Sequence, residues 1–366
     1  MAARERVLTQ RELNRATLAR QLLLKRERVP VVKAVERLGG LQAQEPAAPF
    51  VGLWGRLEGF EAEELRAAIA RRAVVKATLM RGTLHLVSAA DWAHLQPLLG
   101  TATARRGHTT PEETMSAVSE ATLAFARQPR SNRELNDFVA GVGGSVGPGQ
   151  WWRTRTRIPL LHAPTGGPWC FGLQPRLVAP PPRLRARLRD ADAGARLLLV
   201  RHLAAFGPAA VADIARWSHV TTPRVRQELE RLGSRLERLR AEDGRVLHDL
   251  RGAPRPDGDV AAPPRFLPMW DSAILAFDDR TRILPEEHRG EVVNRQGDVR
   301  PTFLVDGVVA GMWRTNGGRV ELLPFAPLPR QARRELEEEA RRLEAWLAPN
   351  DPRVFSRYTG KLSSYV

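Results

Sequence analysis

Two glutamines separated by a single alanine, Gln42 and Gln44, have the residue types and spacing to act together on one substrate. Each amide offers a carbonyl acceptor and an NH₂ donor. In an extended segment both side chains project to the same side, where they could orient a water molecule for hydrolysis, whereas in a helix they diverge by about 200°. Gly39-Gly40 and Pro46 favour a non-helical or helix-edge conformation. Taken alone, the tripeptide is also typical of a solvated loop or helix surface.

Basic and aromatic residues near this pair are candidates for contact with a nucleic acid. Trp54 and Arg56 follow Gln44 closely. Arg56 could pair with a phosphate, whereas Trp54 equally suits a hydrophobic core. Arg81 and His85 are further candidates for such a contact. A single histidine among apolar residues is also typical of a hydrogen-bonded structural group, so both roles stay open for His85.

A second group of aromatic and basic residues lies near the middle of the chain and comprises Trp151, Trp152, Arg153, Arg155 and Arg157. Such a cluster suits phosphate binding and stacking on bases. The alternative is that the tryptophans belong to a core and only the arginines face a ligand.

The whole chain is strongly basic, with 57 lysines and arginines against 41 acidic residues in 366 residues, a formal net charge of +16. A protein this basic is expected to attract a polyanion through phosphate contacts. Nearly all of the excess is arginine, which a coding bias could also explain. The length and the 43% of hydrophobic residues predict two or three modules with cores of their own.

The single cysteine, Cys170, excludes disulfides within the chain and Cys-rich zinc or iron–sulfur sites. We expect neither a metal nor a cofactor. The basic first 29 residues lack the apolar core of a signal peptide, and no stretch reaches the roughly 18 apolar residues of a membrane span. The sequence therefore predicts a soluble cytoplasmic protein, with no membrane partner and no clear dimerisation heptad, and hence a monomer.

Residues 194–250 show the order of a winged helix-turn-helix: three helical patterns followed by a hairpin with Asp243-Gly244 at its turn. The third helix, 221–232, carries Arg224 and Arg226, as a recognition helix can. Residues 114–173 repeat this order more loosely, with a capping box at 131–134 and a short β-like run at 168–173. Residues 10–90 are a third candidate copy. Helical bundles that bind no nucleic acid can show the same pattern.

The C-terminal third is different, because residues 302–314 and 319–325 alternate around tight-turn residues and predict a small antiparallel sheet. Arg314 and Asn316 lie at a hairpin tip that could enter a DNA groove, or serve only the turn. Residues 328–347 predict a solvated packing helix. We expect a mainly α fold with small β-sheets (α+β): three tandem winged-helix modules at 1–110, 111–182 and 183–262, then a β-rich domain at 263–366.

The block 38–57, with Gln42-Ala43-Gln44 and Trp54-Gly55-Arg56, resembles the AlkZ/YcaQ-like family of winged-helix DNA glycosylases. The resemblance continues in order through 80–92, 206–218, 267–280 and 302–314. It implies three winged helices in a C-shape that hold duplex DNA in the concave face. It also implies excision of cationic N-alkylated purines, including N7-alkylguanine, bulky adducts and interstrand crosslinks, with Gln42 and Gln44 as the catalytic pair. A glutamine at the second position resembles the branch that protects producers of genotoxins.

Alkylation at N7 or N3 makes a purine a cationic leaving group, so little acid catalysis is needed and positioning of water is the main task. No lysine is marked for Schiff-base chemistry, which favours monofunctional hydrolysis. Bulky adducts do not fit a closed pocket, so we expect an open cleft with limited base flipping. Two alternatives remain: a non-catalytic winged-helix DNA-binding protein or transcription regulator, and a protein that sequesters a DNA-reactive toxin.

Overall fold

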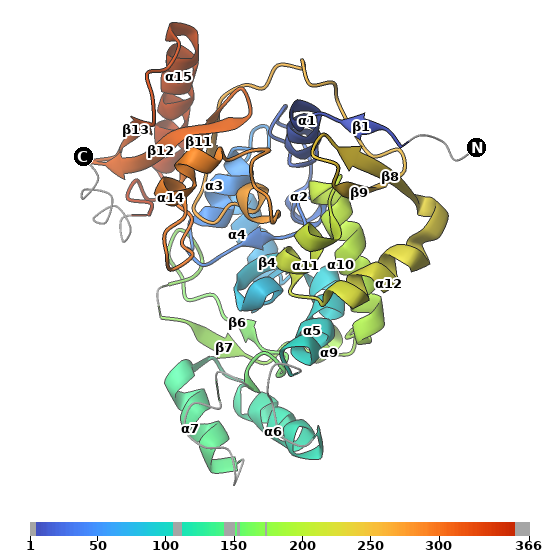
Figure 1. Ribbon diagram of the computed structural model, residues 1–366. Coiled ribbons are helices and arrows are strands. Elements are labelled where there is room, and N and C mark those ends of the chain that lie inside the picture. Colours follow the sequence, from blue (N-terminus) through green and yellow to red (C-terminus); the bar gives the residue numbers. More distant parts are fainter. Residues whose placement is uncertain (1–4, 105–111, 143–150, 152–153, 173, 356–366) are drawn as a thin grey trace.

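The computed structural model describes residues 5–104, 112–142, 151, 154–172 and 174–355. Four small sheets connect its helices, and three of these sheets have three strands each. Figure 1 shows the C-terminal sheet on one side of the molecule, the N-terminal strand on the other, and α6 and α7 projecting at one end. The predicted mixture of helices with small sheets is confirmed.

The first region places a sheet of order β2-β4-β3 among several helices. Both pairings in this sheet are antiparallel, and Gln42 lies opposite His85. The elements, in chain order, are β1 (Val7–Leu8), α1 (Gln10–Arg20), α2 (Val31–Arg37), β2 (Leu41–Gln42), α3 (Ala48–Trp54), α4 (Ala62–Ala70), β3 (Val74–Thr78), the 3₁₀ turn η1 (Met80–Gly82), β4 (Leu84–Ser88) and α5 (Ala89–Ala104).

The second region has a short sheet of order β5-β7-β6. Its elements are α6 (Glu112–Phe125), β5 (Arg130–Ser131), α7 (Asn132–Val142), β6 (Leu161–His162), β7 (Arg176–Val178) and α9 (Pro182–Arg185). The predicted capping box is present, because Ser131 and Glu134 bond to each other's backbone N–H.

The strand expected at 168–173 is wrong, because the described residues there form turns and irregular backbone. Gly166 and Gly167 have left-handed φ of +89° and +78°, and Cys170 has φ of +63°. These values are incompatible with an extended strand. The apolar residues of this run, Trp169 and Phe171, pack into the core around α3 instead.

The third region follows the predicted order of three helices and a hairpin: α10 (Ala191–Phe206), α11 (Val211–Ser218), α12 (Thr222–Leu232), the 3₁₀ turn η2 (Gly233–Arg235), β8 (Leu236–Ala241) and β9 (Val246–Leu250). Local signals explain it. Asp190 caps α10 by accepting from the N–H of Ala193, and Gly244 takes a left-handed φ of +85° in the hairpin turn. The N-terminal strand β1 pairs with β8 in parallel. The start of the chain therefore lies in the sheet of the third region.

The C-terminal region contains a four-stranded sheet of order β10-β11-β12-β13, and all of its pairings are antiparallel. Its elements are β10 (Arg265–Leu267), α13 (Ser272–Leu275), η3 (Glu286–His288), α14 (Arg289–Val292), β11 (Thr302–Val305), β12 (Val308–Asn316), β13 (Arg319–Pro324) and α15 (Arg330–Leu347). The two hairpins and the closing helix were predicted from the sequence, and all are present.

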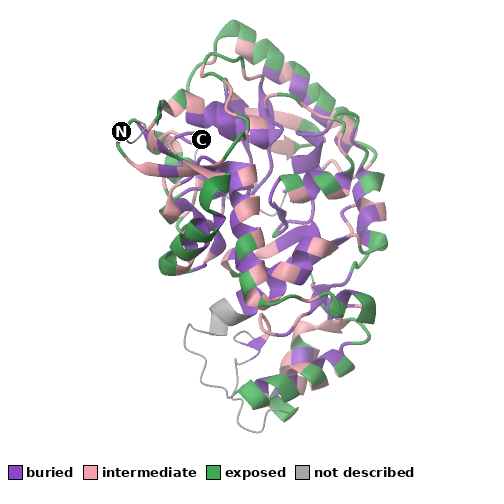
Figure 2. Cartoon of the chain, turned by 90° about the vertical axis from the view of Figure 1, so that its right-hand side faces the viewer, coloured by how far each residue is buried: buried purple, intermediate pink, exposed green. Residues whose placement is uncertain are grey.

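The hydrophobic core continues across these regions. One cluster joins α2, α3 and α4 to the C-terminal sheet and α15, and a second joins β3, β4 and α5 to α10, α11 and α12. The second region has a smaller cluster of its own. Figure 2 shows the buried residues concentrated inside, with exposed faces on the outer helices. No helix in the described part of the chain is long and apolar enough to cross a membrane.

Candidate functional site

Two glycines set the direction in which the glutamine segment leaves α2. Gly39 and Gly40 have left-handed φ of +73° and +88°, and a Cβ on Gly40 would lie 2.9 Å from Cγ1 of Val87. Only glycine adopts this turn easily. The chain then pairs with β4, and the N–H of Ala43 donates to the carbonyl of Leu84 at 2.7 Å. The predicted non-helical conformation of the segment is confirmed.

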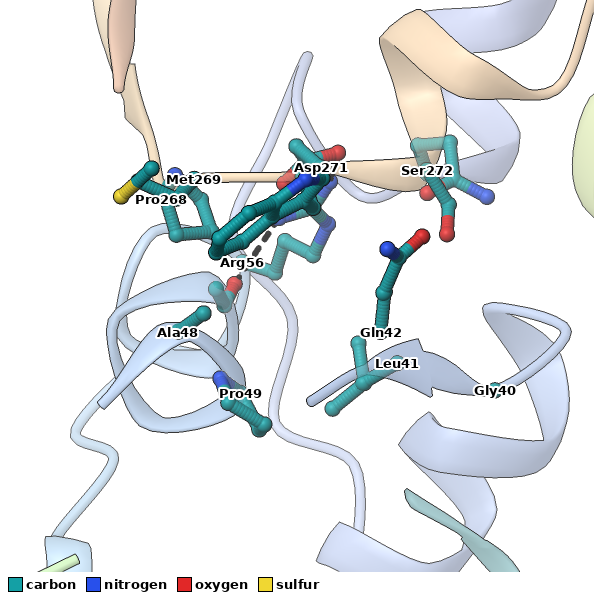
Figure 3. A pocket seen from close by; sticks show the side chains of 13 residues that line it. Gly40, Leu41, Gln42, Ala48, Pro49, Arg56, Pro268, Met269, Asp271 and Ser272 are labelled. Atoms are coloured by element: carbon teal, nitrogen blue, oxygen red, sulfur yellow. Dashed lines mark hydrogen bonds and ion pairs between the residues drawn. The ribbon is translucent and has the colours of Figure 1, made fainter. Parts of the chain in front are cut away.

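Gln42 is buried, with 6% of its surface exposed. Its Oε1 accepts a hydrogen bond from Nη2 of Arg81 at 2.5 Å. Gln42 lines a hollow together with Arg56, Asp271 and Ser272, and Figure 3 shows Gln42 and Ser272 pointing toward one another. The cavity volume is about 10 Å³, which is close to the space of one water molecule. The buried hydroxyl of Ser272 has no hydrogen-bond partner among the described residues.

Gln44 is exposed and lines a different hollow of about 90 Å³ with Lys76, His162 and Phe171. Its Oε1 accepts from the N–H of Leu84 at 2.8 Å. The carbonyl of each glutamine is therefore held by the stretch 81–84, while neither NH₂ has a protein acceptor in the described part of the chain. The stretch 81–84 thus holds both glutamines, but Gln42 and Gln44 line two different hollows.

Arg81 connects the first and third regions. It has a left-handed φ of +58° in η1, and besides Gln42 its guanidinium donates to the carbonyl of Trp217 in α11 at 3.2 Å. Burial and, secondarily, the charge of Arg280 lower its pKa to about 10, so it remains a cation at neutral pH. Arg81 thus holds the carbonyl of Gln42 in place, and its contact with DNA stays a prediction.

His85 is not placed for the expected contact with DNA, because its side chain is completely buried. Its Nδ1 lies 3.1 Å from the carbonyl oxygen of Thr83. Burial, followed by the charge of Arg81, lowers the pKa of His85 to about 3. It is therefore neutral at physiological pH and is a buried structural group on the strand that pairs with Gln42.

Trp54 and Arg56 are also interior residues, which corrects their expected contact with DNA. Arg56 is 1% exposed; it donates to Asp271 at 2.8 Å and to the carbonyl of Gly52 at 3.0 Å. The Trp54 ring lies under the guanidinium of Arg26 at 4.7 Å and against Trp346. Neither side chain reaches a surface where a phosphate could bind.

The predicted cluster near the middle of the chain is only partly described. Trp152 and Arg153 lie outside the described residues. Trp151 is buried in the core of the second region, as the structural alternative expects. Arg155 is half-buried, and this burial lowers its pKa, while Arg157 forms an ion pair with Glu112.

The remaining candidates for contact with DNA differ in whether their side chains bond to an acidic residue. Arg224 forms ion pairs with Asp192 at 2.7 Å and Glu228 at 2.9 Å, whereas Arg226 on the same helix is exposed. In the C-terminal hairpin, Arg314 and Asn316 both bond to Glu321 at 2.6 Å. Among these four, only Arg226 offers a surface cation without an acid partner in the described structure.

Three residues near the site were missed from the sequence. Asp271 and Ser272 lie in the stretch 267–280, which was noticed for its resemblance but given no role. Lys76 is buried over the Phe171 ring at 4.7 Å, and burial, against the opposing effect of Glu45, lowers its pKa to about 8. Only the fold places these residues beside the glutamines. The described residues contain no group of three or more His, Cys, Asp or Glu arranged to hold a metal ion.

Comparison with known proteins gives consistent results. A family model described as DNA glycosylase AlkZ-like matches residues 35–346. An interstrand DNA cross-link repair glycosylase of Streptomyces sahachiroi is 24% identical over 356 residues, which cover 88% of this chain and 92% of that protein. The solved structure of the Streptomyces sahachiroi DNA glycosylase AlkZ has a TM-score of 0.78 at 20% identity, covering 95% of this chain and 98% of that one. At this identity the structural likeness shows the fold alone.

Proposed function

Because this chain belongs to the AlkZ-like DNA glycosylases, we propose that it hydrolyses the N-glycosidic bond of cationic N-alkylated purines in duplex DNA, with Gln42 and Gln44 as the catalytic residues. The observation that supports this most directly is the water-sized hollow between Gln42 and Ser272. The product is an abasic site, and the protein acts in the cytoplasm as a monomer, without metal or cofactor.

Gln42 and Ser272 hold the attacking water in this proposal. The amide carbonyl of Gln42 has a second lone pair beyond the one that accepts from Arg81, and the Ser272 hydroxyl is free to bond to the same water. The exposed Gln44 contacts the sugar or its phosphate through its NH₂. Preorganised dipoles of this kind stabilise an oxocarbenium-like sugar without a strong acid.

The bond changes balance without a cofactor. The glycosidic bond breaks toward the purine, and its electron pair neutralises the charge of the alkylated base. The water oxygen bonds to the anomeric carbon, and its proton passes to solvent. His85 does not supply a proton, because it is neutral and buried at physiological pH.

Bulky lesions are the proposed substrates, by extension from the cross-link repair relative. The hollow beside Gln42 is far too small for a purine, which supports attack in an open cleft with limited base flipping. The modules 1–110, 111–182 and 183–262 would then form a concave face for the duplex, with Arg226 and the tip at Arg314 and Asn316 as further DNA contacts.

The decisive experiment uses a duplex with a single N7-methylguanine, followed by alkali, which cleaves at abasic sites. The wild type is expected to release the base, and Gln42→Ala or Gln44→Ala to slow release by about 100-fold or more. Gln331→Ala is the matched control, since among the described residues the side chain of this glutamine bonds to Glu335 alone, on the same helix, α15. Undiminished release in both site variants would contradict their catalytic assignment.

A second substrate tests the lesion class. A duplex with an interstrand crosslink between two guanine N7 atoms should be unhooked into separate strands on a denaturing gel. If the wild type releases no base from either duplex, the proposed substrate class is wrong.

A further inference from the structure

Arg280 is buried in an unusual way. Only 8% of its surface is exposed, and its Nε and Nη1 are shielded from solvent with no hydrogen-bond partner among the described residues. An arginine cannot avoid this cost by losing its proton: burial, followed by the charge of Arg216, lowers its pKa only to about 10. A buried cation without a partner destabilises a protein, so its presence requires an explanation.

The acids near Arg280 are already engaged by other arginines. Asp278 accepts from Arg216 at 2.8 Å, and Glu286 from Arg289 at 3.1 Å. Since each of these acids is paired with another arginine, the positive charge of Arg280 is not balanced by either of them.

Arg81 is a second cation that, besides being buried, lies close enough to Arg280 for the charge of Arg280 to lower the pKa of Arg81. Arg81 donates to the carbonyl of Trp217, which precedes Ser218 at the end of α11. The residue before Trp217, Arg216, binds Asp278, which is two residues before Arg280 in the chain. No acid is paired with Arg81 or Arg280 in the described structure. Arg81 also donates to Gln42, so the cluster of two cations, Arg81 and Arg280, is directly connected to the proposed catalytic amide.

We propose that Arg81 and Arg280 form a binding site for one backbone phosphodiester of the damaged strand, next to the nucleotide whose base is removed. This inference rests on the proposed function. A phosphodiester carries a permanent negative charge and several acceptor oxygens, which suit two guanidinium groups. Its arrival would supply the missing counter-charge and fix the sugar relative to Gln42.

The test replaces one phosphate at a time by a neutral methylphosphonate in a duplex with 2′-fluorinated N7-methyldeoxyguanosine, which binds but resists cleavage. For the wild type, one position beside the lesion should weaken binding by about tenfold. Arg280→Gln should bind the unmodified duplex about tenfold more weakly and lose nothing further at that position. Arg333→Gln, on α15 and paired with Glu337, is the matched control and should behave as the wild type.

A second measurement separates a binding role from a purely structural one. Removal of an unpaired buried charge should leave the melting temperature of Arg280→Gln equal to or above that of the wild type. Arg280→Lys, which keeps the charge, should recover part of the sensitivity to methylphosphonate. A lower melting temperature without any coupled phosphate position would overturn the proposal.

The design also separates this site from the proposed activity, because binding is measured without cleavage. If the wild type releases bases but no phosphate position is coupled to Arg280, the phosphate site is wrong. If a coupled position is found but no base is released, the site stands and the proposed function fails.

Discussion

Arg56 and Arg280 are both buried arginines, but only Arg56 has an acid of its own in the described structure. Arg56 donates to Asp271, and both side chains are almost completely buried. Arg280 has two shielded nitrogens without a partner, although Asp271 and Arg280 belong to the same stretch of chain, 267–280. The two arginines therefore differ in charge compensation and not in burial.

An acid partner distinguishes arginines that stabilise the fold from arginines that are available to a ligand. Arg20 and Asp249 form another interior pair, at 2.7 Å, which joins α1 to β9. The net charge of +16 is thus only partly a measure of affinity for a polyanion. The arginines without an acid partner are the more informative ones, because their counter-charge must come from outside the protein.

Asp271→Ala should have the largest effect on stability, because it leaves Arg56 charged in the interior. We expect a loss of about 3–5 kcal/mol in the free energy of unfolding, measured by urea denaturation. The control is Glu321→Ala, which removes the partner of the half-exposed Arg314 and should cost at most about 1 kcal/mol. Similar losses in both variants would erase the distinction between buried and surface pairs.

Histidines extend the comparison, because a histidine can lose its charge where an arginine cannot. Burial holds the pKa of His85 and His162 at about 3 and that of His202 at about 4, below the ordinary 6.5. Below pH 6.5 the unfolded chain therefore binds protons that the folded chain does not, so stability present above pH 6.5 is lost as the pH falls.

His162→Gln should accordingly reduce the pH dependence of stability. Between pH 6 and 5, each such histidine contributes at most about 1.4 kcal/mol per pH unit to the slope of the unfolding free energy. Urea denaturation across this range checks the value. An unchanged slope in the variant would mean that His162 takes up protons equally in both states.

The smallest expected effect comes from comparing Arg226, which has no acid partner in the described structure, with Arg224, which has two, on the same helix. Arg226→Ala should weaken duplex binding by a few-fold and lower the slope of log affinity against log salt by about 1, as for loss of one phosphate contact. Arg224→Ala should leave that slope unchanged, because Asp192 and Glu228 already balance Arg224. The reverse ranking would show that ion pairing in the free protein does not predict which arginine meets DNA.

Local sequence signals predicted the elements well. The Ser131–Glu134 capping box, the turn at Gly244 and the break at Gly39-Gly40 each act within a few residues, and each appears where it was expected. The run 168–173 was misread because its aromatic residues resemble a strand, whereas positive φ at Cys170 and its neighbouring glycines excludes one.

The surroundings of the site were less predictable because they depend on contacts distant in sequence. Arg56 looked like a phosphate ligand because its acid, Asp271, lies 215 residues away. The same limit hid the positions of Ser272 and Lys76 beside the glutamines and the unpartnered nitrogens of Arg280. The sequence predicted the two glutamines as the reacting pair, but not that they line separate hollows.

The hydrophobic cluster shared by β3, β4 and α5 with α10, α11 and α12 has a consequence for how the chain can be divided. A cut between α5 and α10 would split one interior, exposing Val87 on one fragment and Phe206 on the other. The stretch that carries the glutamines is therefore no freestanding unit, and a fragment ending after β4 would lose both its shared interior and the Trp217 anchor of Arg81. The second region has a smaller cluster of its own, but Leu161, Val178 and Leu184 of β6, β7 and α9 also belong to the shared cluster, so this region too is joined to the interior of the rest.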